Sequence, residues 1–174
     1  LPLLLMGYYN SILAYGIDEF ARDAGAAGAD GLIEVDLPPE EAAGVQTACA
    51  GRGLDLIYLL APTSSDERIA LVAAQASGFI YCVSLTGVTG ARGQLPAGLS
   101  QFLARVRGHT SLPLAVGFGI SKREHLETVA GLGAEAAVIG SAIINVIDRA
   151  PAEEREERVR EYVEVVTGRR NATV

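Results

Sequence analysis

Six short apolar runs alternate along the chain with longer amphipathic stretches. The runs are LPLLLMGYY, GLIEVDLP, LDLIYLLAP, GFIYCVSL, LPLAVGFG and AAVIGSA. Each run is too short for a core helix and is rich in Leu, Ile, Val and Tyr, so each predicts a buried strand. Between the runs, apolar residues recur at helical spacing, as in Leu99, Leu103 and Val106. Alternating strands and helices of this kind predict a parallel sheet that its crossover helices cover.

Residues that favour the start of a helix precede two of the predicted helices. Ser65 precedes an acidic first turn, and Ser121 is followed three residues later by Glu124, which predicts an N-cap at each serine and a capping box at the second. A last helix is expected from about residue 151 to 166, after the sixth strand. The pattern therefore predicts about six βα units.

Polar or glycine-rich segments follow every predicted strand. In (β/α)8 barrels, known as TIM barrels, the loops at this end of the strands carry the functional site. We therefore expect a single, partial TIM-barrel domain over residues 1–174, rather than a doubly wound sheet, with its site at the carboxyl ends of the strands. The segments are residues 8–10, 36, 62–64, 84–92, 117–121 and 140–141.

The last two of these segments predict a phosphate site. GFGIS places glycines on both sides of Phe118, so that an anion can approach backbone N–H groups, and Gly140 and Ser141 stand where a helix begins with its positive end. Each motif alone is equally typical of a tight strand-to-helix turn. On consecutive strand ends of a barrel, the pair favours phosphate.

Charge and cysteine content narrow the function classes. The net charge is -7, and Arg169 and Arg170 are the main basic pair, so nucleic acid and acidic membranes are disfavoured as partners. The apolar amino-terminal run is too short to span a bilayer. Cys49 and Cys82 have neither a metal spacing nor a disulfide pattern, which predicts no metal site and a cytoplasmic location. The two histidines, His109 and His125, are expected at the surface.

Five segments together resemble the tryptophan synthase alpha chain family. They are GLIEVDLPPEE, LAPTSSDERI, GFIYCVSLTGVTGAR, PLAVGFGIS and VIGSAI, and their order and approximate spacing follow the family over essentially the whole chain. VSLTGVTGAR with GFGIS downstream is specific to this family. Other phosphate-binding barrels of the same pathway are a weaker alternative because they lack the first motif.

The resemblance implies a TIM-barrel lyase of tryptophan biosynthesis. Such an enzyme cleaves indole-3-glycerol phosphate to indole and glyceraldehyde 3-phosphate by a retro-aldol reaction. The resemblance also implies a tryptophan synthase beta chain as partner in an alpha2-beta2 complex. Pyridoxal phosphate belongs to that beta chain, so no cofactor is expected in this chain. Carboxylates are suited to the proton transfers that the cleavage needs.

The match begins at the third strand of the family barrel. By resemblance, the catalytic glutamate lies on the second strand and the catalytic aspartate in the loop after it, so both are expected to be absent from these 174 residues. The sequence therefore predicts an amino-terminally truncated chain that is inactive as an isolated fragment. The alternative is a non-catalytic module that binds a phosphate ligand or a beta chain. Its open barrel edges would also favour self-association.

Site residues are implied for the binding half of the barrel. By resemblance, Tyr81 points inward beside the reacting glycerol, although a purely structural core tyrosine remains an alternative for it and for Tyr8. Thr89 lies in a lid, SLTGVTGAR, that closes over substrate and reaches towards the missing aspartate. The remaining implied residues hold phosphate (Gly90, Gly119, Gly140, Ser141) or wall the pocket (Tyr8, Phe118).

Two carboxylates within the chain are candidate surrogates for the missing pair. Glu34 and Asp36 are two residues apart, which predicts that they share one face of a strand, with Asp36 at its carboxyl end. A hydrophobic residue is more usual in the family where Glu34 stands. A buried glutamate would have a raised pKa and could act as an acid, but a structural carboxylate is the favoured interpretation.

Overall fold

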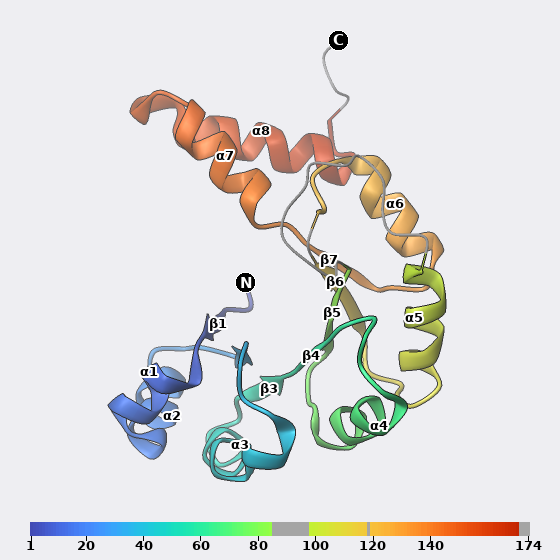
Figure 1. The fold of residues 1–174 in the computed structure, drawn as a ribbon. Helices are drawn as coiled ribbons and strands as arrows, with labels where there is room; N and C mark the ends of the chain where they lie inside the picture. Colours follow the sequence, from blue (N-terminus) through green and yellow to red (C-terminus); the bar gives the residue numbers. More distant parts are fainter. Residues whose placement is uncertain (85–97, 118, 171–174) are drawn as a thin grey trace.

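The computed structural model describes residues 1–84, 98–117 and 119–170. Strands and helices alternate along the chain, as the hydrophobic pattern predicts (Figure 1). The strands are β1 Leu4–Gly7, β2 Gly31–Glu34, β3 Asp55–Ile57, β4 Leu59–Leu60, β5 Ile80–Val83, β6 Leu114–Gly117 and β7 Ala136–Val138. The helices are α1 Tyr9–Tyr15, α2 Ile17–Ala26, α3 Ala43–Ala50, α4 Asp66–Gln75, α5 Leu99–Arg107, α6 Arg123–Gly131, α7 Ser141–Arg149 and α8 Arg155–Thr167, with 3-10 turns at Pro39–Glu41 and Ala152–Glu154.

All strand pairs are parallel, and they run in sequence order. β1, β2 and β3 form one ladder, and β4, β5, β6 and β7 form the next. β3 and β4 are two parts of one strand that is interrupted at Tyr58, whose carbonyl accepts a hydrogen bond from the N–H of Tyr81 at 3.0 Å. Six strand positions therefore follow one another, which agrees with the six predicted runs.

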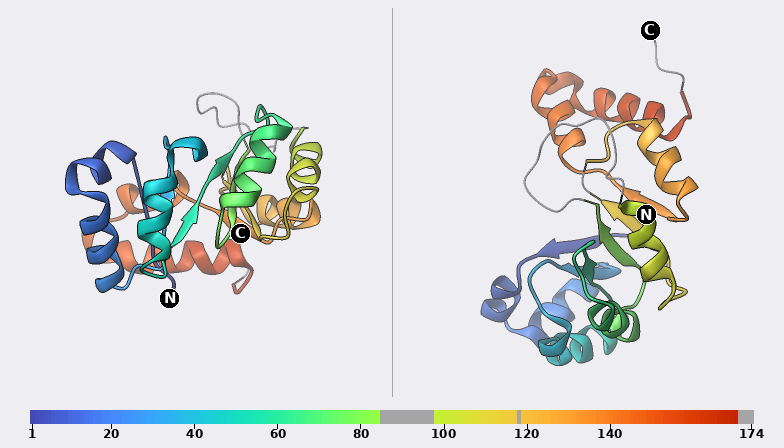
Figure 2. Two further views of the ribbon diagram at one scale, coloured as in Figure 1. Left: turned by 90° about the horizontal axis from the view of Figure 1, so that it is seen from below. Right: turned by 45° about the vertical axis from the view of Figure 1, so that its right-hand side comes forward.

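The two faces of the sheet bury different side chains. On one face, alternate strand residues such as Leu32, Leu56 and Val116 pack with apolar residues of the helices in the larger core. On the other face, Ile33, Ile57 and Tyr81 form a smaller cluster with strand residues or their immediate neighbours alone. Figure 2 shows the helices outside the curved sheet, so this second face is the concave one. Side-chain alternation along each strand thus separates a helix-covered core from a lumen.

The helix boundaries confirm one predicted cap and correct another. The Ser65 hydroxyl accepts from the N–H of Arg68 at 3.2 Å, so the N-cap of α4 is confirmed. The capping box at Ser121 and Glu124 is wrong, because Lys122 occupies the N-cap position of α6 and makes no side-chain cap bond. The last helix, α8, ends at Thr167, and its C-cap Gly168 adopts a left-handed φ of 76° that favours glycine.

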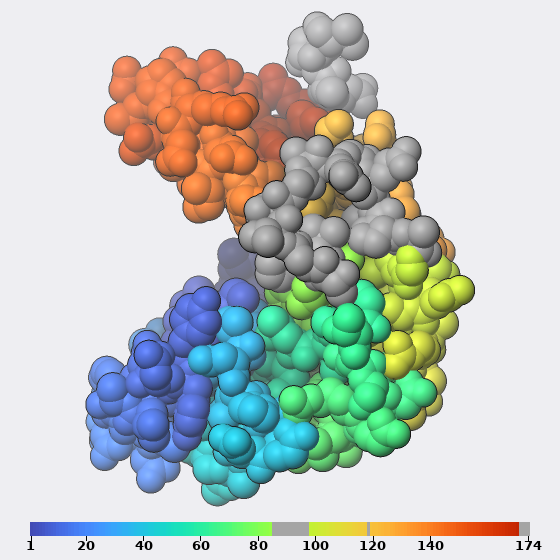
Figure 3. Space-filling model, in the orientation of Figure 1, coloured from blue at the N-terminus to red at the C-terminus, as the bar shows by residue number. Residues whose placement is uncertain are grey.

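The two outer strands leave an open side. Among the described residues, β1 pairs only with β2 and β7 only with β6. Leu3, directly before β1, and Met6, within it, are 52% and 54% exposed. Figure 3 shows a hollow on this side between α7 and the amino-terminal segment. None of the described helices has both the length and the apolar character needed to span a bilayer.

Candidate functional site

The carboxyl ends of β5, β6 and β7 meet at one edge of the sheet. Val83 is in register with Gly117, and Gly117 with Val138. Ser84, directly after β5, is buried and donates from its hydroxyl to the carbonyl of Gly117 at 2.7 Å, and its backbone N–H donates to the same oxygen at 3.0 Å. Two donors on one carbonyl fix the end of β6 against β5. From the sequence, Ser84 was expected at the start of the lid, but it was not predicted that its hydroxyl fixes the end of β6.

Tyr81 lies on the concave face, as expected for a residue that points into the barrel. It is 4% exposed, and burial raises the pKa of its phenol. Its ring passes over Gly117, where an added Cβ would overlap the phenol hydroxyl and ring. Gly117 is therefore required by the position of Tyr81, a constraint that the motif GFG alone does not reveal.

The loop after β6 and the start of α7 supply backbone donors at this edge. Gly119 has a φ of 77°, which a residue with a side chain rarely adopts. Gly140 is the N-cap of α7, and an added Cβ there would meet open space. Ser141 is the first residue of α7 and is exposed. Because β6 and β7 are neighbours, these two strand-to-helix connections lie side by side.

The start of α7 carries no negative side-chain charge. Its first turn contains no acidic residue, which is also true of α1, α3 and α5, whereas α2 begins with Asp18 and Glu19, and α4 with Asp66 and Glu67. The first N–H groups of a helix lack partners within the helix, and its dipole favours an anion. The amino end of α7 is thus suited to an external anion rather than to an acidic side chain of its own.

Tyr8 is not brought into this group. Tyr8 lies at the carboxyl end of the edge strand β1 and is 61% exposed. Thr89, Gly90 and Phe118 lie outside the described residues, so their expected roles remain predictions.

The surrogate carboxylates lie elsewhere, and the prediction that they share one face of a strand is wrong. β2 ends at Glu34, so Asp36 lies beyond it, where its carboxylate accepts from the N–H of Tyr9 at 2.8 Å and caps α1. Glu34 is in register with Gly7 and on the face of Leu32, which is the helix-covered side rather than the concave side of Tyr81. The structure therefore separates Glu34 from the lumen.

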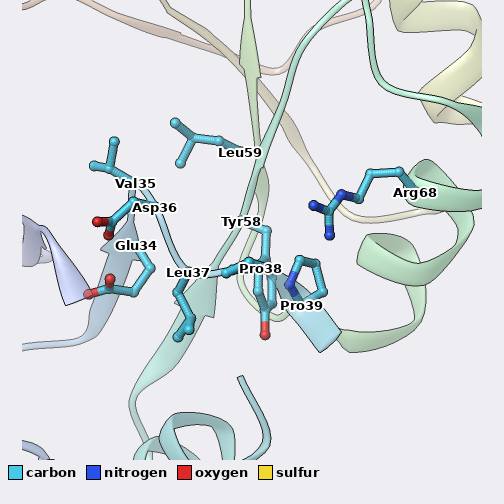
Figure 4. Close-up of a pocket in the computed structure, with 9 residues that line it drawn as sticks. All are labelled: Glu34, Val35, Asp36, Leu37, Pro38, Pro39, Tyr58, Leu59 and Arg68. Atoms are coloured by element: carbon cyan, nitrogen blue, oxygen red, sulfur yellow. The ribbon is translucent and has the colours of Figure 1, made fainter. Parts of the chain in front are cut away.

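Glu34 nevertheless has unusual surroundings. It is 2% exposed, and neither carboxylate oxygen has a hydrogen-bond partner among the described residues. Burial, with a contribution from Asp36, raises the pKa of Glu34 to about 7. A pocket of about 160 Å³ lies beside it, and Figure 4 shows the Glu34 and Asp36 carboxylates on the side of that pocket away from Arg68. Arg68 pairs with Glu40 instead.

His125 corrects another expectation. It was expected at the surface, but it is 6% exposed in the first turn of α6. Its Nδ1 accepts a hydrogen bond from the N–H of Ser121 at 3.2 Å. The helical spacing of Val129 and His125, four residues apart, places both on the buried face of α6 and could have indicated this position. Among the described residues, no three His, Cys, Asp or Glu side chains gather as a metal site would require.

The chain is a protein of the TIM-barrel class. Its parallel sheet is curved, its helices lie on the outside (Figure 2), and glycine-rich loops follow the carboxyl ends of its last strands. The sequence model of the family described as tryptophan synthase alpha chain matches residues 1–173. The alpha chain of Roseiflexus castenholzii is 57% identical over 167 residues, which are 96% of this chain and 64% of the relative. That of Geobacter sulfurreducens is 51% identical over 163 residues, 93% and 61% of the two chains.

A solved structure of the tryptophan synthase a2b2 complex from Pyrococcus furiosus superposes with a TM-score of 0.87 at 36% identity, over 96% of this chain and 67% of that one. The chain belongs to the tryptophan synthase alpha chain family. It spans about 64% of the length of the curated relatives that match it over most of its own length.

Proposed function

We propose that these residues form the phosphate-binding part of a lyase that cleaves indole-3-glycerol phosphate to indole and glyceraldehyde 3-phosphate in tryptophan biosynthesis. The observation that carries the proposal is the pairing of Gly119, with its φ of 77°, and the acid-free amino end of α7 on neighbouring strands. Both present backbone N–H groups, which bind phosphate oxygens without a lysine. Membership of the alpha chain family supports the choice of substrate.

In this proposal the residues of the chain bind and orient the substrate. Gly119, Gly140 and Ser141, with Gly90, hold the phosphate, and Tyr81 lies in the lumen beside the glycerol portion. Tyr8 and Phe118 wall the pocket, and Thr89 belongs to the loop that closes it. The proton transfers are assigned to a glutamate and an aspartate outside the 174 residues, and no role is assigned to Glu34 or Asp36. No cofactor is required in this chain.

We propose a tryptophan synthase beta chain as the macromolecular partner. The Pyrococcus furiosus relative is described as an a2b2 complex, and family membership supports the same assembly here. Self-association through the outer edges of β1 and β7 is a second proposed interaction, because unpaired strand edges accept further strands. Two free, buried cysteines, Cys49 and Cys82, support a reducing, cytoplasmic location.

The test combines a binding titration with a turnover assay of the 174-residue chain. Indolepropanol phosphate, an unreactive substrate mimic, should bind, and indole-3-glycerol phosphate should release no indole. Binding without turnover supports the binding role, and turnover would show that catalytic groups lie within the chain. Absence of binding would overturn the proposal.

A matched pair of variants tests the position of the phosphate. Gly140→Asp places a carboxylate at the N-cap of α7, and Gly98→Asp does the same at the N-cap of α5, where an added Cβ also meets open space. We expect the first variant to weaken binding at least about tenfold through charge repulsion at short range, and the second to leave it unchanged. Equal effects of the two variants would contradict the proposed site.

A further inference from the structure

Two side chains from different helices hold the peptide groups of Ser121, in the loop between β6 and α6. The Nδ1 atom of His125, on α6, accepts from the N–H of Ser121 at 3.2 Å. The hydroxyl of Tyr162, on α8, donates to the carbonyl oxygen of Ser121 at 2.9 Å. The loop is thus fixed on both sides of one residue by groups that are 4 and 41 positions away in the sequence.

The ring of His125 contributes to the structure through its Nδ1 atom, which acts as an acceptor. Nε2 is buried and has no hydrogen-bond partner among the described residues. An apolar side chain would leave no such unpartnered nitrogen. The hydrogen bond with the Ser121 N–H is therefore the feature that a histidine provides here.

The held residue adjoins the proposed phosphate site. Ser121 is two residues after Gly119, whose left-handed backbone follows the end of β6. α8, which carries Tyr162, packs against both α6 and α7. The amino ends of these two helices border the site, so α8 connects the loop after β6 with the helix after β7.

We propose that His125 and Tyr162 are positioning residues for the anion site, which fix the backbone of Gly119–Ser121 before ligand binds. The inference rests on the proposed phosphate function. Backbone donors bind an anion well only when they are already oriented, because ordering a loop on binding reduces the affinity. Through the hydrogen bond of Tyr162 to Ser121, helix α8 influences the orientation of the backbone donors of the site.

Three variants test the role of the clamp formed by His125 and Tyr162. Tyr162→Phe removes one hydroxyl and keeps the ring. His125→Asn keeps an acceptor near the position of Nδ1, and His125→Leu removes it. Tyr15→Phe is the control, since the Tyr15 hydroxyl also makes one hydrogen bond, to Asp23 at 2.8 Å, but on the exposed α1–α2 surface. Amide hydrogen exchange of Gly119–Ser121 and the Kd values of inorganic phosphate and indolepropanol phosphate are measured for each variant and the wild type.

We expect Tyr162→Phe and His125→Leu to accelerate exchange of the Ser121 amide and to weaken both ligands about three- to tenfold by a common factor, since the phosphate is the shared group. His125→Asn should stay within about twofold of the wild type, because the acceptor is retained. Tyr15→Phe should change neither quantity. A merely structural role would lower the melting temperature without changing the Kd.

The outcomes separate the two proposals. If Tyr162→Phe and His125→Leu have the same Kd values as the wild type, the positioning role is overturned and the proposed function stands. An unchanged rate of amide exchange at Ser121 in these variants has the same consequence. A wild-type chain that binds neither ligand overturns the proposed function, and the positioning role with it. Tyr162→Phe keeps the test decisive if His125→Leu does not fold.

Discussion

Glu34 places a carboxylate on the helix-covered face of the sheet, where its neighbours are apolar or weakly polar. Cys49 and Tyr58 are the nearby titratable groups on that face, and burial raises the pKa of both, to about 11 and about 12. Neither supplies a positive charge to the carboxylate. A buried carboxylate in such a place is stable mainly in its protonated form.

The pH dependence of stability should therefore report on Glu34. Its folded-state pKa, about 7, lies above the ordinary value of 4.5, so the native state holds an extra proton between these pH values. The contribution of Glu34 to the stability of the folded state is fully present below about pH 4.5 and is lost as the pH rises to about 7 and beyond. Between pH 5 and pH 8, the free energy of unfolding of the wild type should fall on the order of 2 to 3 kcal/mol relative to that of Glu34→Gln.

Urea unfolding of both proteins at the two pH values measures this difference. Glu157→Gln, an exposed glutamate of α8, is the matched control and should keep the pH dependence of the wild type. If the free energies of unfolding of wild type and Glu34→Gln differ by the same amount at both pH values, Glu34 does not titrate in this range.

Gly117 and Tyr81 should be energetically coupled. Gly117→Ala places a methyl group where the Tyr81 phenol lies, so we expect a loss of about 1–3 kcal/mol through overpacking. Tyr81→Leu removes the obstructing end of the ring, so Gly117→Ala should cost markedly less in that background. A double-mutant cycle from urea unfolding measures the coupling. Additive effects of the two substitutions would contradict the steric explanation.

At the scale of elements, Arg107 ties three segments together at the amino ends of β6 and β7. Its guanidinium donates to the carbonyl of Leu112 at 2.9 Å and to both carboxylate oxygens of Glu135 at 2.6 and 2.7 Å. Glu135 also accepts from the N–H of Leu114, which lowers the pKa of that carboxyl more than Arg107 does. The end of α5 is thereby fixed to two strands on the side opposite the site.

Arg107→Ala should therefore reduce stability and leave ligand binding unchanged. We expect a loss of about 1–2 kcal/mol in the free energy of unfolding, since the bond to a backbone carbonyl and the charge-assisted bonds to the Glu135 carboxylate are lost together. Arg160→Ala is the control, because Arg160 pairs with Glu156 on the exposed surface of α8, where such pairs contribute about 0.5 kcal/mol or less. Thermal unfolding with a phosphate titration checks both parts, and a weaker Kd in Arg107→Ala would contradict the separation of this network from the site.

The hydrophobic pattern was sufficient to predict the strands and helices but not the interruption of a strand or the contacts between distant residues. Six strand positions and the cap at Ser65 were predictable because each depends on local sequence. The break at Tyr58 depends on contacts between distant segments, which no local pattern contains. The burial of His125 could have been predicted from its helical spacing with Val129. The glycines of the proposed site were predicted from their motifs, whereas the hydrogen bond from Tyr162 to Ser121, 41 residues away in the sequence, was not predicted.

For the whole molecule, the important feature is a sheet with two outer strands. Among the described residues, β1 and β7 each have one strand neighbour, and Leu3 and Met6 expose apolar surface at the β1 edge. Backbone groups on an outer edge pair readily with another strand, and apolar side chains beside them favour the contact. The fold that aligns the loops of the proposed anion site therefore also leaves surface for association.

We expect the 174-residue chain to self-associate as its concentration rises, through the β1 edge. Met6→Lys should shift the equilibrium towards monomer, because a lysine on an outer strand opposes the approach of a second strand. Leu13→Lys is the matched control, since Leu13 is 59% exposed and lies on helix α1 rather than on a strand. Sedimentation velocity across a range of concentrations measures the equilibrium. A wild type that stays monomeric throughout, or an equal shift in both variants, would show that the β1 edge does not drive association.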